Sequence, residues 1–246
     1  MIVRQAANVL DLLEFFARNR KPANLAEVAS SMGWPRSSTF NLLTTLTQRG
    51  FLYEPRPRAG FYPSQRWLSL LTTIAETEQL PEDLCEAVNE VARETNETVA
   101  ICAPAGVNAV LSYVVQSPEL IRFTADVGYQ MPIHVTAGGR ALLSQYSTRE
   151  RATLLRKIKY TEYCHRSLTN AEQVEAEIKR AASRGWHENV EGYAADMVGV
   201  ALPAKLRDRP ISIVVGGPAS RMRRQIAQVA ATLLRSLKRC ATVTLA

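Results

Sequence analysis

The 246-residue sequence has few cysteines and histidines, and neither type is spaced as in a metal site or a disulfide framework. The cysteines stand at positions 85, 102, 164 and 240, and the histidines at positions 134, 165 and 187. Cys164 and His165 are adjacent, whereas the ligands of structural zinc are separated along the chain. We therefore expect free thiols, no bound metal and no required cofactor.

The sequence also lacks a long apolar run and a secretory leader. No uninterrupted hydrophobic stretch approaches the ~20 residues needed to cross a bilayer. Together with the unpaired cysteines, these absences predict a cytoplasmic protein that does not contact a membrane. Motifs of hydrolases, phosphate loops and dinucleotide folds are absent as well. No nucleophile, base and orienting group can be matched, so we expect no catalytic residues.

Positive charge is in excess and is concentrated near the start of the chain. The formal net charge is +7 and the sequence pI is about 9.4. Residues 1–68 carry nine Lys/Arg and four Asp/Glu, a net charge of +5, whereas residues 69–246 carry 21 and 19, a net charge of +2. This distribution favours a polyanionic partner for the N-terminal segment.

Residues 24–49 show the pattern of two short helices. Asn24-Leu-Ala-Glu27 is typical of a capping box, and it predicts a helix that ends at Gly33. Pro35 suits the first turn of a second helix that continues to Arg49. The side chains of this helix that we expect in the core are Phe40, Leu43 and Leu46. Small polar groups lie on its opposite face.

A basic hairpin pattern follows the two helices. Phe51-Leu-Tyr53 and Gly60-Phe-Tyr62 flank the cationic segment Glu54-Pro-Arg-Pro-Arg58, which predicts two strands around a basic tip. Helix, turn, polar-faced helix and basic hairpin is the order of a winged helix-turn-helix, whose second helix enters the major groove of DNA. An alternative interpretation is a small helical domain whose Ser/Thr-rich helix simply faces solvent.

The predicted DNA contacts follow from the chemistry of bases and phosphates. Base edges are read by hydrogen-bond donors and acceptors, and phosphates are held by positive charge. Asn41 can pair with adenine through two hydrogen bonds, and short hydroxyl side chains let the helix approach closely. Arginines suit phosphates or the minor groove. The predicted DNA-binding residues are Asn24, Arg36, Ser37, Ser38, Thr39, Asn41, Arg49, Arg56 and Arg58.

Two further helices are expected around this segment, one over residues 3–18 and one from Ser64 to about residue 75. The second carries an apolar stripe formed by Trp67, Leu68, Leu71 and Ile74. Such a stripe suits a dimer contact, and burial against its own domain is equally compatible with the pattern. We place the domain boundaries at residues 1–63, 64–80 and 81–246.

The remaining sequence predicts an α+β domain with a mainly antiparallel sheet flanked by helices. Expected helices span residues 82–95, 136–143, 148–157, 170–184 and 221–239. Expected strands span residues 97–103, 109–115, 121–125, 186–190, 198–202 and 211–215. The first two strands are joined by a turn containing Gly and Asn, which is a hairpin signal.

These motifs resemble a known family. Residues 3–70 resemble the winged helix-turn-helix of IclR-type bacterial transcription regulators, notably in Trp34-Pro-Arg-Ser-Ser-Thr-Phe-Asn-Leu-Leu43 and Arg49-Gly-Phe51. Residues 80–240 resemble the GAF/profilin-like effector-binding domain of that family. The matching motifs are Met131-Pro-Ile-His-Val-Thr-Ala-Gly-Gly-Arg-Ala-Leu-Leu143, Arg184-Gly-Trp186 and Val215-Gly-Gly-Pro-Ala-Ser-Arg221. The resemblance implies a homodimer, or a dimer of dimers, that binds a pseudopalindromic operator and responds to a small metabolite.

The resemblance also implies which residues line the effector pocket. Those effector-binding residues are Phe123, Val127, His134, Thr136, Ala137, Gly138, Arg140, Glu191, Met197, Gly199, Val214 and Gly216. Asp196-Met-Val-Gly199 departs from the common Gly-Val-Arg-Cys of the family, and Val214 and Gly216 stand where many members have serines. Loss of a thiol and two hydroxyls predicts a larger, more apolar pocket that favours an aromatic ligand. The carboxylate of an aromatic acid would meet the Gly138 turn, Arg122 or Arg140.

The sequence therefore predicts a ligand-responsive DNA-binding transcriptional regulator, a repressor, without catalysis. Its expected partners are double-stranded operator DNA, a small aromatic compound or organic acid, and further copies of itself. Two alternatives remain open. The C-terminal domain either serves oligomerisation alone, or it processes a metabolite as an enzyme with a basic accessory domain.

Overall fold

The computed structural model describes residues 3–57, 59–76 and 79–245, and it divides into two compact units, Met1–Gln79 and Leu80–Ala246. Each unit has its own hydrophobic core. None of the helices in the described ranges is both long enough and apolar enough to cross a bilayer. The four cysteines are free thiols.

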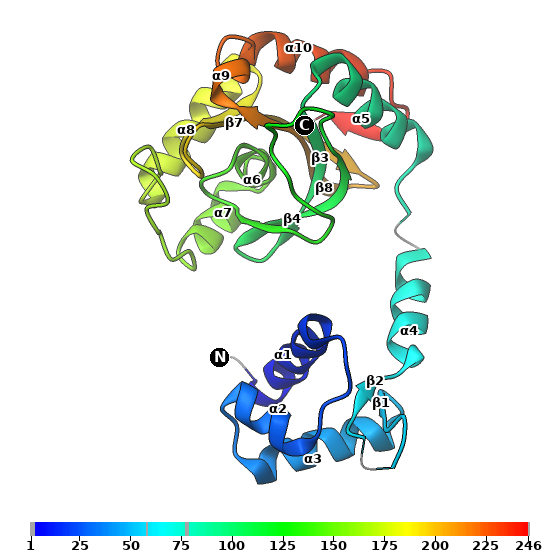
Figure 1. Ribbon diagram of the computed structural model, residues 1–246. Coiled ribbons are helices and arrows are strands. Elements are labelled where there is room, and N and C mark those ends of the chain that lie inside the picture. The colour runs from blue at the N-terminus through cyan, green and yellow to red at the C-terminus, as the bar shows by residue number, and fades with distance from the viewer. Residues whose placement is uncertain (1–2, 58, 77–78, 246) are drawn as a thin grey trace. The chain divides into compact units, whose positions relative to one another are not determined.

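The first unit is a winged helix-turn-helix (Figure 1). Its elements are α1 (Arg4–Asn19), α2 (Leu25–Met32), α3 (Arg36–Gln48), β1 (Leu52–Tyr53), β2 (Tyr62–Pro63) and α4 (Gln65–Glu76). Its core is formed by Leu12, Phe16, Ala23, Val28, Leu43, Leu46 and Leu52. The predicted capping box is confirmed, because Asn24 Oδ1 accepts the Glu27 amide at 3.0 Å and Glu27 Oε2 accepts the Asn24 amide at 2.8 Å.

The core face of α3 differs from the predicted one at a single position. Phe40 is 55% exposed, and Thr39 is fully buried in its place beside Leu43 and Leu46. Positions 39 and 40 both lie within a helical turn of Leu43, so spacing alone does not distinguish them. The Thr39 hydroxyl donates to the Pro35 carbonyl at 3.0 Å, which satisfies it and allows its burial.

The start of α4 belongs to the core of the first unit. The Trp67 indole N–H donates to the Phe51 carbonyl at 3.0 Å, and the two rings lie 4.4 Å apart. The Ser64 hydroxyl donates to the Gly50 carbonyl. Trp67 therefore does not continue the exposed stripe, which comprises Leu68, Leu71 and Ile74 at 62%, 59% and 62% exposure.

The second unit is an antiparallel sheet flanked by helices, and the predicted fold class is confirmed. Its helices are α5 (Glu82–Thr95), α6 (Ala137–Leu143), α7 (Thr148–Leu155), α8 (Ala171–Arg184), α9 (Ala219–Met222) and α10 (Ile226–Leu237). Its strands are β3 (Thr98–Ala105), β4 (Asn108–Val115), β5 (Gln130–Pro132), β6 (His187–Val190), β7 (Met197–Leu206), β8 (Arg209–Pro218) and β9 (Val243–Leu245). The strand order is β5-β4-β3-β8-β7-β6, and β9 pairs with β7.

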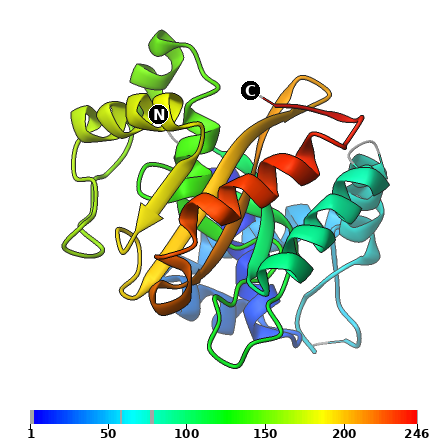
Figure 2. The same ribbon diagram turned by 90° about the horizontal axis from the view of Figure 1, so that it is seen from above.

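The two faces of the sheet are covered by different helices. Figure 2 shows α5 and α10 side by side over one face, and α6 packs on the other face against β7, β8 and β3. Successive residues of a strand point to opposite faces. Val99 and Ile101 accordingly join the core under α5 and α10, whereas Ala100 and Cys102 join the core under α6.

Several predicted elements of the second unit need correction. Residues 121–125 form a loop instead of a strand, because side chains hold their carbonyls: Thr98 Oγ1 donates to the Phe123 carbonyl and Gln116 Nε2 to the Ala125 carbonyl. The β3–β4 turn falls at Gly106 and residue 107, before Asn108. The closing helix is divided into α9 and α10, and β5 and β9 were not predicted.

Candidate functional site

Helix α3 presents a polar face to solvent. Ser37, Asn41 and Gln48 are exposed along one side of the helix, at intervals of four and seven residues. Thr45 is exposed beside them, but its hydroxyl donates to the Asn41 carbonyl at 2.7 Å. Within the described ranges, the Asn41 side-chain amide makes no hydrogen bond, so its donor and acceptor are available to a base edge.

Exposed arginines flank this polar face. Arg36 lies at the first position of α3, Arg49 follows its last residue, and Arg56 lies in the turn between β1 and β2. All three side chains are exposed, as phosphate contacts require. Ser38 is exposed as well. The predicted contact of Arg58 lies outside the described residues.

The structure rules out one of the predicted DNA contacts and limits a second. The prediction for Thr39 is wrong, because its side chain is fully buried and its hydroxyl is bound to Pro35. Asn24 is exposed, but its oxygen is committed to the first turn of α2, so only its NH2 group remains for another partner.

Besides Thr45, two exposed residues of α3 were not predicted as contacts. Gln48 continues the line of Ser37 and Asn41 at the end of the helix, and helical spacing was a sufficient signal for it. Phe40 was assigned to the core, yet its exposed ring has the chemistry that contacts a thymine methyl group. The surface of α3 therefore offers both polar and apolar groups.

The second unit holds a small apolar cavity on the α6 face of the sheet. Its volume is about 60 Å³. It is lined by Thr98, Ala100, Phe123, Met131, Thr136, Ala137, Gly138, Asn189, Tyr193, Ala194, Met197, Val198, Gly199, Val214 and Gly216. These residues come from the sheet, from the start of α6 and from two loops, so segments far apart in sequence meet there.

Phe123 occupies one side of this cavity. Its ring packs on strand β8 at Gly216, where an added Cβ would lie 3.2 Å from Phe123 Cδ1. Because Gly216 has no side chain, the strand leaves room for the Phe123 ring. Thr98 Oγ1 donates to the Phe123 carbonyl at 2.6 Å and holds the loop.

A pair of tyrosines links the two loops beside the cavity. The hydroxyls of Tyr129 and Tyr193 are 3.0 Å apart and share a hydrogen bond. Tyr163 lies against Tyr193, with ring centroids 5.4 Å apart. Burial, assisted by the bond to Tyr129, raises the pKa of Tyr193, so its hydroxyl stays protonated at neutral pH.

Eight of the predicted effector-binding residues line this one cavity. They are Phe123, Thr136, Ala137, Gly138, Met197, Gly199, Val214 and Gly216. The structure adds Thr98, Ala100, Met131 and Asn189, which reasoning from the sequence missed. Alternation along β3 was the available signal for Thr98 and Ala100, because both face the same side of the strand.

His134 and Arg140 lie elsewhere, which corrects their predicted role. Arg140 is buried, and its guanidinium donates to the carbonyls of His134 and Glu188. Burial lowers the pKa of Arg140 to about 10. His134 is buried against Tyr160, with ring centroids 5.1 Å apart, and burial followed by the charge of Arg140 lowers its pKa to about 4. Neither side chain lines the cavity.

Val127, Glu191 and Arg122 also do not line the cavity. Val127 is 65% exposed on the loop after Phe123. The Glu191 carboxylate forms an ion pair with Arg223. Arg122 Nη1 donates to the Glu119 carbonyl at 2.7 Å. The expectation that Arg122 or Arg140 meets a bound carboxylate is therefore wrong for this structure.

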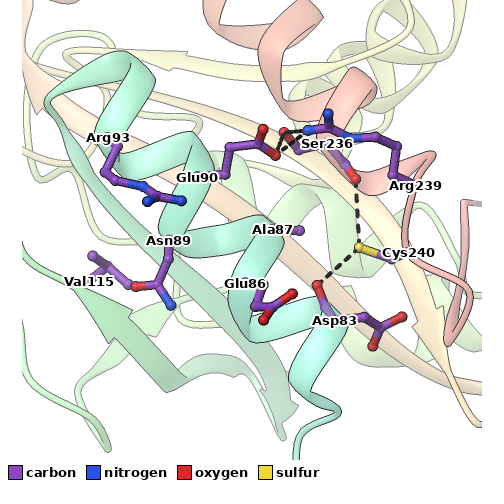
Figure 3. A pocket seen from close by; sticks show the side chains of 10 residues that line it. All are labelled: Asp83, Glu86, Ala87, Asn89, Glu90, Arg93, Val115, Ser236, Arg239 and Cys240. Atoms are coloured by element: carbon purple, nitrogen blue, oxygen red, sulfur yellow. Dashed lines mark hydrogen bonds and ion pairs between the residues drawn. The ribbon is translucent and has the colours of Figure 1, made fainter.

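A second, wider groove lies between α5 and α10, and Figure 3 shows its side chains. Two of its charged groups are bound together: Glu90 pairs with Arg239 and accepts from the Ser236 hydroxyl at 3.0 Å. Asp83 accepts the Thr242 hydroxyl at 2.6 Å, and this bond lowers the pKa of Asp83. These contacts fasten the C-terminal segment to α5 and indicate a structural role.

Comparison with known proteins identifies both units. The family model described as bacterial transcriptional regulator IclR C-terminal matches residues 72–243, and the IclR helix-turn-helix model matches residues 5–56. The chain belongs to the IclR family. It is therefore a transcriptional regulator with an N-terminal DNA-binding helix-turn-helix and a C-terminal effector-binding domain.

Curated IclR-family relatives cover most of the chain. The acetate operon repressor of Salmonella typhimurium is 25% identical over 224 residues, which cover 89% of this chain and 82% of the relative. The glycerol operon regulatory protein of Streptomyces coelicolor is 23% identical over 232 residues, which cover 94% of this chain and 90% of the relative.

Solved IclR structures share the fold of the chain. A regulator from Silicibacter aligns with a TM-score of 0.73 and 20% identity, over 96% of this chain and 95% of the other. An IclR homologue from Microbacterium hydrocarbonoxydans, crystallised with 4-hydroxybenzoate, aligns with a TM-score of 0.70 and 17% identity, over 96% and 100% of the two chains. The winged helix-turn-helix followed by an effector-binding domain is thus a shared architecture.

Proposed function

We propose that this IclR-family regulator represses transcription by binding a pseudopalindromic operator, and that a small aromatic molecule in the α6-face cavity changes its affinity for DNA. The observation that carries the proposal is the polar face of α3. It exposes an uncommitted amide at Asn41 between arginines at both ends of the helix. The repressor names of relatives such as the acetate operon repressor support the direction of regulation.

Self-association is part of this proposal. The exposed row of Leu68, Leu71 and Ile74 on α4 is apolar over two turns of the helix. A two-fold arrangement built on this row would present two α3 helices to half-sites separated by whole turns of DNA. A tetramer would then be a pair of such dimers.

An aromatic ligand fits the chemistry of the cavity. Its floor is formed by Ala100, Val214 and Gly216, and the IclR homologue bound to 4-hydroxybenzoate supports an aromatic class. A protein cavity that binds benzene has a volume of roughly 150 Å³, more than the 60 Å³ found here. Admission of a ring therefore requires lining side chains to move, and we assign this movement to Phe123 and its loop.

The proposal is tested by selecting genomic DNA fragments with the purified full chain, at several salt concentrations, and repeating the selection with aromatic compounds present. We expect fragments that share an inverted repeat and that are released by one class of compound. Equal retention of scrambled duplexes at every salt concentration would refute operator recognition. A ligand-induced rise in Tm separates a sensor from a domain that only oligomerises, and turnover of the ligand without DNA would favour the enzyme alternative.

A further inference from the structure

We propose that the molecule bound in the α6-face cavity is uncharged, that the cavity rejects carboxylates, and that Asn189 supplies the polar anchor. This inference rests on the proposed function and specifies its ligand. It depends on three features of the described residues: the lining side chains, the partners of the nearest arginines, and the uncommitted amide of Asn189.

The lining contains no ionisable cation. Among the fifteen described residues around the cavity, none is Lys, Arg or His, and none is Asp or Glu. A carboxylate transferred from water into such surroundings loses its hydration without gaining a counter-charge. A neutral molecule of the same shape avoids this cost, so the lining alone favours an uncharged ligand.

Nearby arginines are committed to other partners. Arg221 forms two bonds with the Glu97 carboxylate, at 2.7 and 2.9 Å, and a third with the Ile121 carbonyl at 2.9 Å. Arg223 pairs with Glu191. Arg140 donates to two backbone carbonyls, those of His134 and Glu188. None of these guanidinium groups lines the cavity, so a ligand carboxylate held inside it has no cation in direct contact.

The start of α6 does not replace a cation. The helix has seven residues, and the Thr136 hydroxyl accepts the Gly139 amide at 3.2 Å while donating to the Pro132 carbonyl at 3.0 Å. Its first turn is therefore already capped, and the field of so short a helix is weak. The glycine-rich turn packs closely: a Cβ on Gly138 would lie 3.0 Å from Cys102 Sγ.

Two polar side chains of the lining keep hydrogen-bonding capacity: Tyr193, whose hydroxyl already shares a bond with Tyr129, and Asn189, whose amide has no partner among the described residues. Thr98 Oγ1 donates to the Phe123 carbonyl and accepts the Ser117 amide at 3.1 Å, so it is committed. Asn189, on β6 opposite Gly199, makes no side-chain hydrogen bond within the described ranges. Its oxygen lies against Gly192, where an added Cβ would collide with it.

This arrangement leaves the NH2 group of Asn189 as a donor. A ligand that matches it carries one hydrogen-bond acceptor, such as an amide or ketone carbonyl, on an otherwise apolar body. A lining of apolar groups with one placed polar group is how ligand pockets commonly fix orientation.

The test compares benzamide, benzoate and toluene, which share a ring and differ in charge and polarity. Binding to the full chain at pH 8 is measured by calorimetry, and the site is identified by NMR contacts between ligand protons and the methyl groups of Met197 and Val214. We expect benzamide to bind at least about tenfold more tightly than benzoate, since an unpaired buried charge is costly.

The variant Asn189→Leu separates the anchor from the rest of the cavity. We expect it to weaken benzamide about tenfold, the cost of one buried hydrogen bond, and to leave toluene binding unchanged. Unchanged toluene binding also shows that the variant is folded. Retention of full benzamide affinity by this variant would overturn the role of Asn189.

The remaining outcomes distinguish this inference from the proposed function. Benzoate binding as tightly as benzamide, with contacts to the same methyl groups, would overturn the inference and leave an aromatic-responsive sensor intact. Absence of contacts from all three compounds at millimolar concentration would overturn the cavity as an effector site, and the proposed function would lose its ligand site with it.

Discussion

At the scale of single residues, Asn41 is the side chain through which α3 is expected to read sequence. We predict that Asn41→Ala costs about 1–3 kcal/mol on the preferred operator, as expected for loss of a base contact, and relaxes preference at one base position. The measurement is a titration of the operator and of single-base variants. Thr45→Ala is the control, because its hydroxyl is already bound to the Asn41 carbonyl. An equal loss of affinity for all sequences would indicate that Asn41 contacts phosphates and not a base.

Phe123 is the residue that we expect to limit ligand size. Phe123→Ala removes the ring that packs at Gly216 and enlarges the cavity. We predict that the variant binds a two-ring compound such as naphthalene, which the native protein excludes, measured by ligand-observed NMR. The control Val127→Ala lies on the exposed part of the same loop, and this variant should still exclude naphthalene. Naphthalene binding to the native protein at similar affinity would contradict this prediction.

His134 should make stability depend on pH. Burial, followed by the charge of Arg140, lowers its folded pKa to about 4, below the ~6.5 of an unfolded chain. Between these values the unfolded chain binds a proton that the folded chain does not, so stability is full above about pH 6.5 and falls on acidification toward pH 4.

Replacement of His134 tests this dependence. We predict that His134→Phe reduces the slope of unfolding free energy against pH by about 1.4 kcal/mol per pH unit within that window. His187, whose pKa burial lowers to about 3, accounts for a further part of the native slope. Urea unfolding at several pH values measures this slope of unfolding free energy against pH. The variant His165→Asn, at an exposed histidine, is the control. An unchanged slope in His134→Phe would contradict the assignment.

Residue patterns predicted contacts better than they predicted burial. The capping box was predictable from Asn24 and Glu27 because it involves only neighbours in sequence. The predicted burial of Thr39 and Phe40 was reversed in the structure. The Thr39 hydroxyl can be buried because it bonds to a carbonyl four residues earlier, at Pro35. The role of Arg140 was not predictable, since its partner Glu188 is brought to it only by the folding of β6 against α6.

At the scale of elements, the hairpin of β1 and β2 is expected to bind DNA through charge. We predict that Arg56→Ala weakens binding to all sequences and lowers the slope of log affinity against log salt concentration by about 0.9. This is the change expected when one phosphate contact, and the counterion that it releases from the DNA, is lost. Titrations across salt concentrations measure the slope. Lys159→Ala, which removes the same charge from the second unit, is the control. A loss confined to one operator sequence would indicate a base contact instead.

Long periodic elements were predictable, whereas short ones were not. The bounds of α5 match the predicted 82–95 because apolar residues recur at helical spacing over its whole length. The strands β5 and β9 have three residues each and depend on pairing with β4 and β7, which no local pattern records. Six of the fifteen residues that line the cavity lie on loops or short strands, and the predicted part of its lining came from the family resemblance.

At the scale of the whole molecule, the exposed row of α4 should hold two copies together. We predict that Leu71→Glu converts the dimer to a monomer and abolishes cooperative operator binding, because a charge cannot be buried unpaired in an apolar contact. Sedimentation and DNA titration measure the two effects. Thr73→Glu is the control on the opposite side of the helix, where its hydroxyl bonds to Ser69. A dimeric Leu71→Glu protein would exclude α4 as the contact.

The anchoring of Trp67 to the Phe51 carbonyl has a geometric consequence. The N-terminal turn of α4 cannot swivel independently of the hairpin, so the hairpin follows any reorientation of the helix. Twelve residues of helix span about 18 Å. A tilt of roughly 10° about the distal end therefore carries the hairpin through about 3 Å, close to the ~3.4 Å step between adjacent base pairs. A small tilt of α4 thus suffices to shift the hairpin by about one base-pair step along the DNA.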